Sequence, residues 1–130
     1  MTTSTSTRLR MYGLKGITVY LRVNSLNSEM PKIYEYLGII IYFYSNEHEP
    51  IHVHGQYNDM ELKAEFIVEN GEITKIILKS VQNRKPLTGA QLDDFTNFVE
   101  KYANEIVIKW VDYFVYHKKI KPEKITRRIQ

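Results

Sequence analysis

The chain has 130 residues, a formal net charge of +3 and no cysteine. This length fits one domain with one hydrophobic core. The lack of cysteine excludes disulfide frameworks and thiolate chemistry. No apolar run reaches the roughly 18 residues of a membrane span. Residues 1–10 lack the apolar segment of a secretory signal, so we expect a cytoplasmic protein without membrane partners.

The charge is distributed unevenly along the chain. Residues 1–29 carry a net +3, residues 30–116 a net −5 and residues 117–130 a net +5. Basic ends favour contact with nucleic acid or an acidic partner, and short solvated tails are the alternative. We divide the chain into an N-terminal extension (1–29), a single domain (30–118) and a basic C-terminal tail (119–130).

Four stretches between residues 16 and 68 have strand patterns. Apolar and polar residues alternate in the extension, which predicts a strand within residues 16–24. Residues 39–44 form a β-branched and aromatic run, which predicts a strand buried on both faces. Residues 51–57 and 60–68 flank Asn58-Asp59 and predict a hairpin with a two-residue turn.

The register of this hairpin can be predicted by counting. Pairing residues whose numbers sum to 117 separates every apolar side chain from every polar one, and a slip of one residue would destroy that separation. Val53 then lies opposite Ala64 on the apolar face. On the polar face, His52 lies opposite Glu65.

A second hairpin is predicted to turn at residues 69–71. A three-residue loop pairs residues whose numbers sum to 140 and places Ala64 opposite Ile76 in the core. A two-residue loop would instead turn lysines toward the core. The longer loop leaves Ile73 and Ile77 on the polar face, where they need cover from the N-terminal strand or from a second copy.

The second half of the chain has helical periodicity. Thr88 is a predicted N-cap and forms a capping-box pattern with Gln91. Apolar residues at helical spacing continue to about residue 117, which gives a helix of ~42 Å. Such a helix outreaches a small sheet, so we expect a kink near Asn104 or a partner's surface. The predicted fold is α+β: an antiparallel β-meander of about four strands, plus the N-terminal strand, packed on one long C-terminal helix.

Three of the four histidines lie within seven residues, as His48, His52 and His54. The predicted register places His52 and His54 on one face of a strand, within reach of His48 from the preceding loop. One interpretation is a site for a divalent metal such as zinc, with three nitrogen ligands and one open position. Glu65 suits a fourth ligand, an orienter of a ring or a general base.

Two other interpretations stay open. Lys63 opposite His54, and Lys75 beside Glu65, suit a bound phosphate better than a metal, as in an acid–base histidine pair that acts on a phosphodiester. Alternatively, the histidines are structural and His52 pairs with Glu65. We interpret the fourth histidine, His117, as structural, because a cation suits the C-terminus of a helix.

The chain resembles a bacterial family catalogued as domain of unknown function 4160, from residue 30 to about residue 128. The resemblance is carried by Met30-Pro31-Lys32-Ile33, Gly38, His48-x-Pro50-x-His52-x-His54, Gly71 and Trp110. Family members often have a second proline where this chain has Ile51. The resemblance implies no established activity. It implies a gene arrangement like that of a toxin–antitoxin module, and it makes residues 1–29 an extension before Met30.

Two classes of function follow from these observations. In the first, the protein is the toxin-like component of such a module, acts on RNA or another phosphodiester through the histidine cluster, and has a small antitoxin-like protein as its partner. In the second, it is a non-catalytic interaction module that touches nucleic acid through its basic ends, and the cluster is structural. Either class is compatible with a homo-oligomer.

Overall fold

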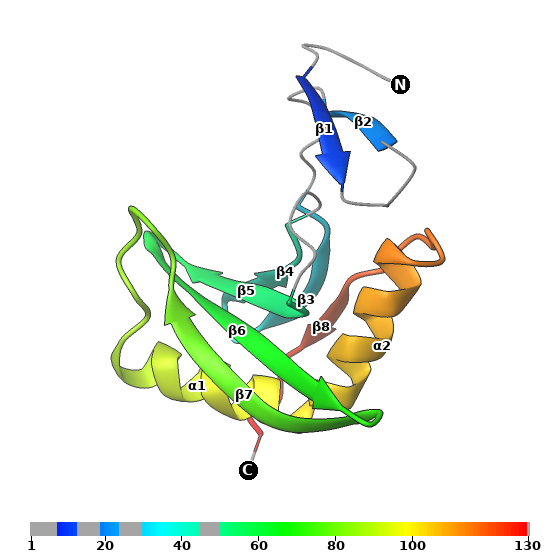
Figure 1. The fold of residues 1–130 in the computed structure, drawn as a ribbon. Helices are drawn as coiled ribbons and strands as arrows, with labels where there is room; N and C mark the ends of the chain where they lie inside the picture. Colours follow the sequence, from blue (N-terminus) through cyan, green and yellow to red (C-terminus); the bar gives the residue numbers. More distant parts are fainter. Residues whose placement is uncertain (1–7, 13–18, 24–29, 45–49, 130) are drawn as a thin grey trace.

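The computed structural model describes residues 8–12, 19–23, 30–44 and 50–129, which form an α+β fold (Figure 1). Six strands form one sheet in the order β7-β6-β5-β4-β3-β8, and two helices pack against one of its faces. The strands are β3 (Lys32–Tyr36), β4 (Ile39–Tyr42), β5 (His52–Tyr57), β6 (Met60–Glu69), β7 (Glu72–Ser80) and β8 (Glu123–Ile125), and the helices are α1 (Gly89–Lys101) and α2 (Ala103–Phe114). The fold class is confirmed, but the prediction of about four antiparallel strands and one helix is wrong.

The β5–β6 hairpin has the predicted register. Val53 pairs with Ala64, and His52 pairs with Glu65. The apolar face of the hairpin meets the helices, where a side chain at Gly55 would collide with the ring of Phe95. The polar residues of β5 and β6 therefore lie on the sheet face that turns away from the helices, because successive side chains of a strand alternate between faces.

The predicted register of the β6–β7 hairpin is wrong by two residues. Ala64 pairs with Leu78, and Phe66 pairs with Ile76. The turn is the two-residue Asn70-Gly71 loop, and both of its residues have positive φ. Opposite Ile67 and Val68, β7 contains one extra residue, Thr74, and this bulge shifts the pairing by one residue. This extra residue keeps Ile76 on the core face, which a two-residue loop alone would not do.

A strand that the sequence did not predict precedes β4. β3 pairs with β4 through a two-residue turn at Leu37-Gly38, and both turn residues have positive φ. Such turns favour Asn-Gly, and leucine rarely adopts positive φ, so the turn has no clear sequence signal. Tyr34 and Tyr36 of β3 are buried against Phe98 of α1.

The single long helix is replaced by two helices that meet at Tyr102. Tyr102 has φ −100° and ψ 16°, which ends α1 and starts α2. Its ring stacks on Phe98 at 4.4 Å between centroids. The break turns α2 toward the β3 side of the sheet, where Phe43 contacts Phe114 (Figure 1). Thr88 is the N-cap of α1 as predicted, but its side chain makes no capping hydrogen bond.

Residues 119–129 contain a strand instead of a solvated tail. β8 pairs in parallel with β3 at the edge of the sheet. Beyond β8, Arg128 forms an ion pair with the buried Asp94 of α1, and the backbone amide of Ile129 donates to the Tyr36 hydroxyl at 2.8 Å. The C-terminal segment therefore contributes to the packed structure.

The N-terminal extension contains the predicted strand and a second one. β2 (Val19–Val23) pairs antiparallel with β1 (Arg8–Tyr12) in a separate two-stranded sheet. β2 falls within the predicted 16–24 range. None of the helices in the described part of the chain has the length and apolar character needed to cross a membrane.

Candidate functional site

The polar face of β4, β5 and β6 holds a buried cluster of titratable side chains. His54 is 2% exposed and Glu61 is 3% exposed, and Tyr42, His52 and Glu65 are also buried. Tyr42 of β4 pairs with His54 of β5, which pairs with Lys63 of β6. Buried polar groups are stable only when they are hydrogen-bonded, so their partners define the site.

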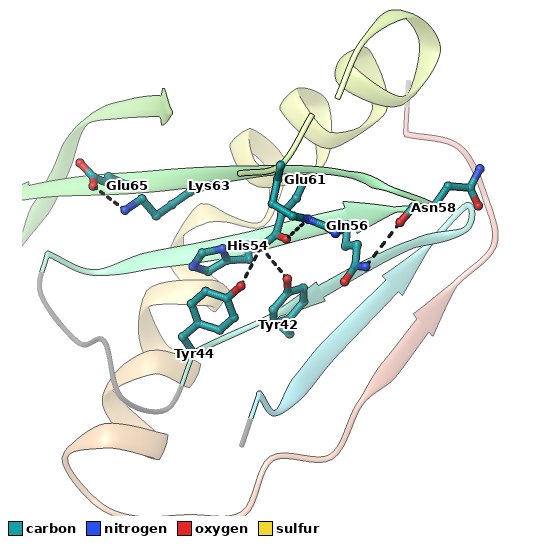
Figure 2. A network of polar contacts seen from close by, with 9 residues as sticks. Tyr42, Tyr44, His54, Gln56, Asn58, Glu61, Lys63 and Glu65 are labelled. Carbon is teal, nitrogen blue, oxygen red and sulfur yellow. Dashed lines mark hydrogen bonds and ion pairs between the residues drawn. The ribbon is translucent and has the colours of Figure 1, made fainter. Parts of the chain in front are cut away.

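Glu61 lies at the centre of this cluster (Figure 2). Its Oε2 accepts hydrogen bonds from the Tyr42 hydroxyl at 2.6 Å, the Tyr44 hydroxyl at 3.1 Å and His54 Nδ1 at 2.9 Å. Its Oε1 accepts from Arg84 Nε at 3.0 Å. Burial, and then the bond to Glu61, raise the pKa of Tyr42 well above its usual range, so its hydroxyl remains a donor.

The hydrogen bonds of both histidines fix the positions of their protons. The carboxylate of Glu61 only accepts, so His54 carries a proton on Nδ1. His52 Nδ1 lies 2.7 Å from the carbonyl oxygen of Pro50, which also only accepts. In the neutral state each ring therefore has its lone pair on Nε2. The two ring centroids are 5.2 Å apart.

Glu65 and Lys63 form a second group on the same face. Glu65 Oε2 lies 3.5 Å from Lys63 Nζ, and Glu65 Oε1 lies 3.0 Å from Lys79 Nζ. Burial acts to raise the pKa of Glu65, but the hydrogen bonds and charges of Lys79 and Lys63 outweigh it and lower the pKa below its ordinary value. Glu65 is therefore a carboxylate at neutral pH, held by two lysines.

Four of the five residues predicted for the site divide among these groups. His54 belongs to the Glu61 cluster, Lys63 and Glu65 form the ion-paired group, and His52 lies between them as the cross-strand partner of Glu65. His48 lies outside the described residues. Within the described ranges, no three His, Cys, Asp or Glu side chains converge as a metal site would require. The predicted three-histidine metal set, which includes His48, stays a prediction.

Lys75 does not lie beside Glu65 as expected, and His117 lies just after the end of the second helix. Lys75 pairs with Ile67 and not with Glu65, because the bulge at Thr74 of β7 shifts the register. Lys79 pairs with Lys63 and takes the position beside Glu65. His117 is exposed and has positive φ after the end of α2.

The central residue of the site, Glu61, was not among the predicted site residues. The hairpin register contains a signal for it, because Glu61 is a diagonal cross-strand neighbour of His54 on the polar face. Tyr42 and Tyr44 follow from the alternation of the β4 run only once β4 is paired with β5. Arg84 has no signal in the strand pattern, because it reaches the site from the loop after β7.

Comparison of the sequence with models of protein families identifies the family of this chain. Residues 38–111 match the family model described as domain of unknown function (DUF4160). The match covers more than half of the chain, and the chain therefore belongs to this family. No curated protein and no solved structure gives a significant match.

Proposed function

We propose that the protein is the toxin-like component of a toxin–antitoxin-like pair and cleaves RNA in the cytoplasm through His52 and His54. The observation that supports this proposal is the 2.9 Å hydrogen bond from His54 Nδ1 to the buried Glu61 carboxylate. A carboxylate in this position orients the ring and stabilises the imidazolium that forms when Nε2 takes a proton. This is the arrangement of a general base.

Cleavage of an RNA phosphodiester needs a base, an acid and positive charge. His54 Nε2 would take the proton of the ribose 2′-hydroxyl, and the 2′-oxygen would attack the phosphorus. Protonated His52 would give its proton to the departing 5′-oxygen as the phosphorus–oxygen bond breaks. The products are a 2′,3′-cyclic phosphate and a 5′-hydroxyl, so no further reactant is consumed.

The positive charge for this reaction can come from two places. Lys63 and Lys79 share the single carboxylate of Glu65, which leaves one positive charge in excess beside His52. Arg84 binds Glu61 through Nε, and its Nη2 is buried without a hydrogen-bond partner in the described part of the chain. Such donors stabilise the charge that develops on a phosphate in the transition state.

Growth after induced expression tests the toxin proposal. We expect the wild-type chain to arrest growth and His54→Asn to abolish the arrest, because the Asn amide keeps a donor toward Glu61 but lacks the basic Nε2. His52→Asn is the second variant, and His117→Asn is the matched control that keeps the arrest. Soluble protein with a wild-type circular dichroism spectrum must be shown for each variant. A folded His54→Asn chain that still arrests growth would exclude His54 as the base.

A non-catalytic interaction module with a structural histidine cluster is the second candidate. Burial favours it, because His54 and Glu61 are nearly inaccessible and both oxygens of Glu61 already accept hydrogen bonds. A phosphodiester could reach His54 only if side chains that surround it, such as Tyr42 and Tyr44, moved. In this case His54→Asn would alter the unfolding free energy alone and leave every biological readout per folded molecule unchanged.

Chelation separates the metal form of the site from the phosphate form. If His48, His52 and His54 hold a divalent ion such as zinc, a chelator would reproduce the loss caused by His52→Asn. If the site holds only a phosphate, chelation would have no effect and Lys63→Ala would weaken activity. Metal analysis of the purified protein provides an independent readout.

A further inference from the structure

Three aromatic rings of the described part of the chain pack against His54. The ring centroid of Tyr44 lies 3.9 Å from that of His54, and the centroids of His52 and Tyr42 lie at 5.2 Å and 5.5 Å. Tyr44 is the closest of the three (Figure 2). Because His54 is 2% exposed, a molecule from solvent can contact its imidazole only after part of this cover has moved.

Two of the three rings are fixed by strands and by short hydrogen bonds. Tyr42 is the β4 residue that pairs with His54, it is buried, and its hydroxyl donates to Glu61 at 2.6 Å. His52 is a buried residue of β5, and its Nδ1 lies 2.7 Å from the carbonyl oxygen of Pro50. Moving either ring would break a hydrogen bond of a buried side chain, which is costly.

Tyr44 is held less firmly than the other two rings. β4 ends at Tyr42, so Tyr44 lies beyond the last residue pair between β4 and β5. Its side chain is half-buried, and its hydroxyl donates to Oε2 of Glu61 at 3.1 Å. This is the longest of the three hydrogen bonds that Oε2 accepts from described residues.

Oε2 of Glu61 has more donors than it needs. A carboxylate oxygen offers about two lone pairs, and Oε2 accepts from the Tyr42 hydroxyl, the Tyr44 hydroxyl and Nδ1 of His54. Without the bond from Tyr44, Oε2 keeps the two shorter bonds, and Oε1 keeps its bond from Arg84. A rotation of Tyr44 into solvent therefore leaves the Glu61 cluster hydrogen-bonded, whereas a movement of Tyr42 would remove its shortest bond.

We propose that Tyr44 is a gate over His54. Rotation of its side chain about the Cα–Cβ bond removes the ring from the imidazole and opens His54 to a molecule from solvent, while the rest of the cluster stays in place. The structure shows the closed state. The gate gives RNA a route to a buried base, and this role rests on the proposed cleavage. The motion itself does not, so the test measures access to His54 and uses no activity.

Modification by diethyl pyrocarbonate measures this access, because the reagent reacts with unprotonated imidazole nitrogens that it can contact. Tandem mass spectrometry of peptides gives the rate at each histidine of the full chain, and the exposed His117 is the reference for full access. In the wild-type chain we expect His54 to react far more slowly than His117, at a rate that does not change with low concentrations of urea. A gate exposes little surface, whereas opening by unfolding accelerates with urea.

Two variants of Tyr44 test the gate. Tyr44→Phe keeps the ring and loses the hydrogen bond to Glu61, so we expect the rate at His54 to rise roughly two- to tenfold, the population change that one hydrogen bond causes. Tyr44→Ala removes the ring and is expected to raise the rate further. Tyr116→Ala is the matched control, because Tyr116 is 63% exposed at the end of α2, and it should keep the wild-type rate.

A rise at His54 in either Tyr44 variant that is absent from Tyr116→Ala supports the gate, and Tyr44→Phe decides if Tyr44→Ala does not fold. Wild-type rates in every Tyr44 variant that folds, or the same rise in Tyr116→Ala, would overturn it. So would a wild-type His54 that reacts as fast as His117 or only through unfolding. Intact RNA together with the expected modification pattern would overturn the proposed cleavage and leave the gate in place.

Discussion

His54 of β5 donates a hydrogen bond from Nδ1 to Oε2 of Glu61 of β6 at 2.9 Å, and both side chains are buried. The two residues are diagonal neighbours across the β5–β6 hairpin, whose register follows from the sequence. Glu61 also binds Arg84, which brings the loop after β7 to the histidine. One carboxylate thus connects β4, β5, β6 and this loop.

Replacing Glu61 is expected to destabilise the fold strongly. Glu61→Ala leaves Arg84 and His54 without their shared acceptor in a buried site, and breaking a buried ion pair costs about 3–5 kcal/mol. Glu65→Ala is the matched comparison, because the partners of Glu65 are lysines that reach solvent. Urea denaturation measures the free energy of unfolding of both variants. A larger loss for Glu65→Ala than for Glu61→Ala would contradict the central role of Glu61.

The ion pairs of Glu65 predict a pH dependence of stability. The pKa of Glu65 is lower in the folded chain than its ordinary value of 4.5. Its contribution is therefore present above that value and is lost as the pH falls through the lower folded pKa. We expect the wild-type chain to lose stability more steeply than Glu65→Gln below pH ~4.5. Parallel slopes in denaturation series at several pH values would show that these ion pairs do not contribute.

Gly55 tests how closely the sheet and α1 approach each other. A Cβ at Gly55 would overlap the ring of Phe95, so Gly55→Ala is expected to destabilise by roughly 1–3 kcal/mol, the usual cost of overpacking. Gly71→Ala is the control, because it meets no atoms and suffers only from its positive φ, at a cost of about 1 kcal/mol. Thermal or urea unfolding compares the two. An unchanged stability for Gly55→Ala would mean that α1 lies further from the sheet.

The two faces of α2 differ in what they contribute. Trp110 is 8% exposed and packs on Phe114 at 4.9 Å, so Trp110→Ala is expected to cost about 3–5 kcal/mol. Ile108, on the same helix, is 59% exposed, and Ile108→Ala is expected to stay within about 0.5 kcal/mol. Urea denaturation measures the loss of unfolding free energy in each variant. Equal losses would contradict the prediction, because they would mean that the two side chains are equally buried.

The C-terminal segment is expected to contribute to stability as well as to binding. Removing residues 122–130 deletes β8 and the partner of the buried Asp94, so the melting temperature is expected to fall. Lys119→Gln with Lys121→Gln changes only exposed side chains, so it is expected to preserve the melting temperature and weaken nucleic-acid binding and its salt dependence. A truncated chain with unchanged melting temperature would restore the interpretation of a solvated tail.

The sequence determines the β5–β6 hairpin because alternation and a short turn leave one register that separates polar from apolar residues. The same reasoning fails at β6–β7, where the bulge at Thr74 depends on burial of Ile76 and leaves no mark in the alternation. It also fails at Leu37-Gly38, where leucine occupies a left-handed position. These features are decided by tertiary packing.

Like the fold, the candidate site could be predicted from the sequence only in part. The shared face of His52 and His54 follows from the strand period, and the position of Glu61 could have been read from the register. Arg84 could not, because its loop is placed by long-range contacts such as the hydrogen bond from the Glu61 amide to the Lys85 carbonyl at 2.7 Å. The break at Tyr102 likewise depends on the ring packing of Phe98 and Tyr34.

Cleavage of a defined RNA by the purified full chain tests the proposed function most directly. The substrate is a short single-stranded RNA, compared with the same sequence in which every 2′-hydroxyl is methylated. The account predicts cleavage of the first substrate to a 2′,3′-cyclic phosphate and a 5′-hydroxyl, no cleavage of the second, and loss of cleavage in folded His54→Asn but not in His117→Asn. Intact RNA with the wild-type chain, or equal cleavage by wild type and His54→Asn, would contradict it.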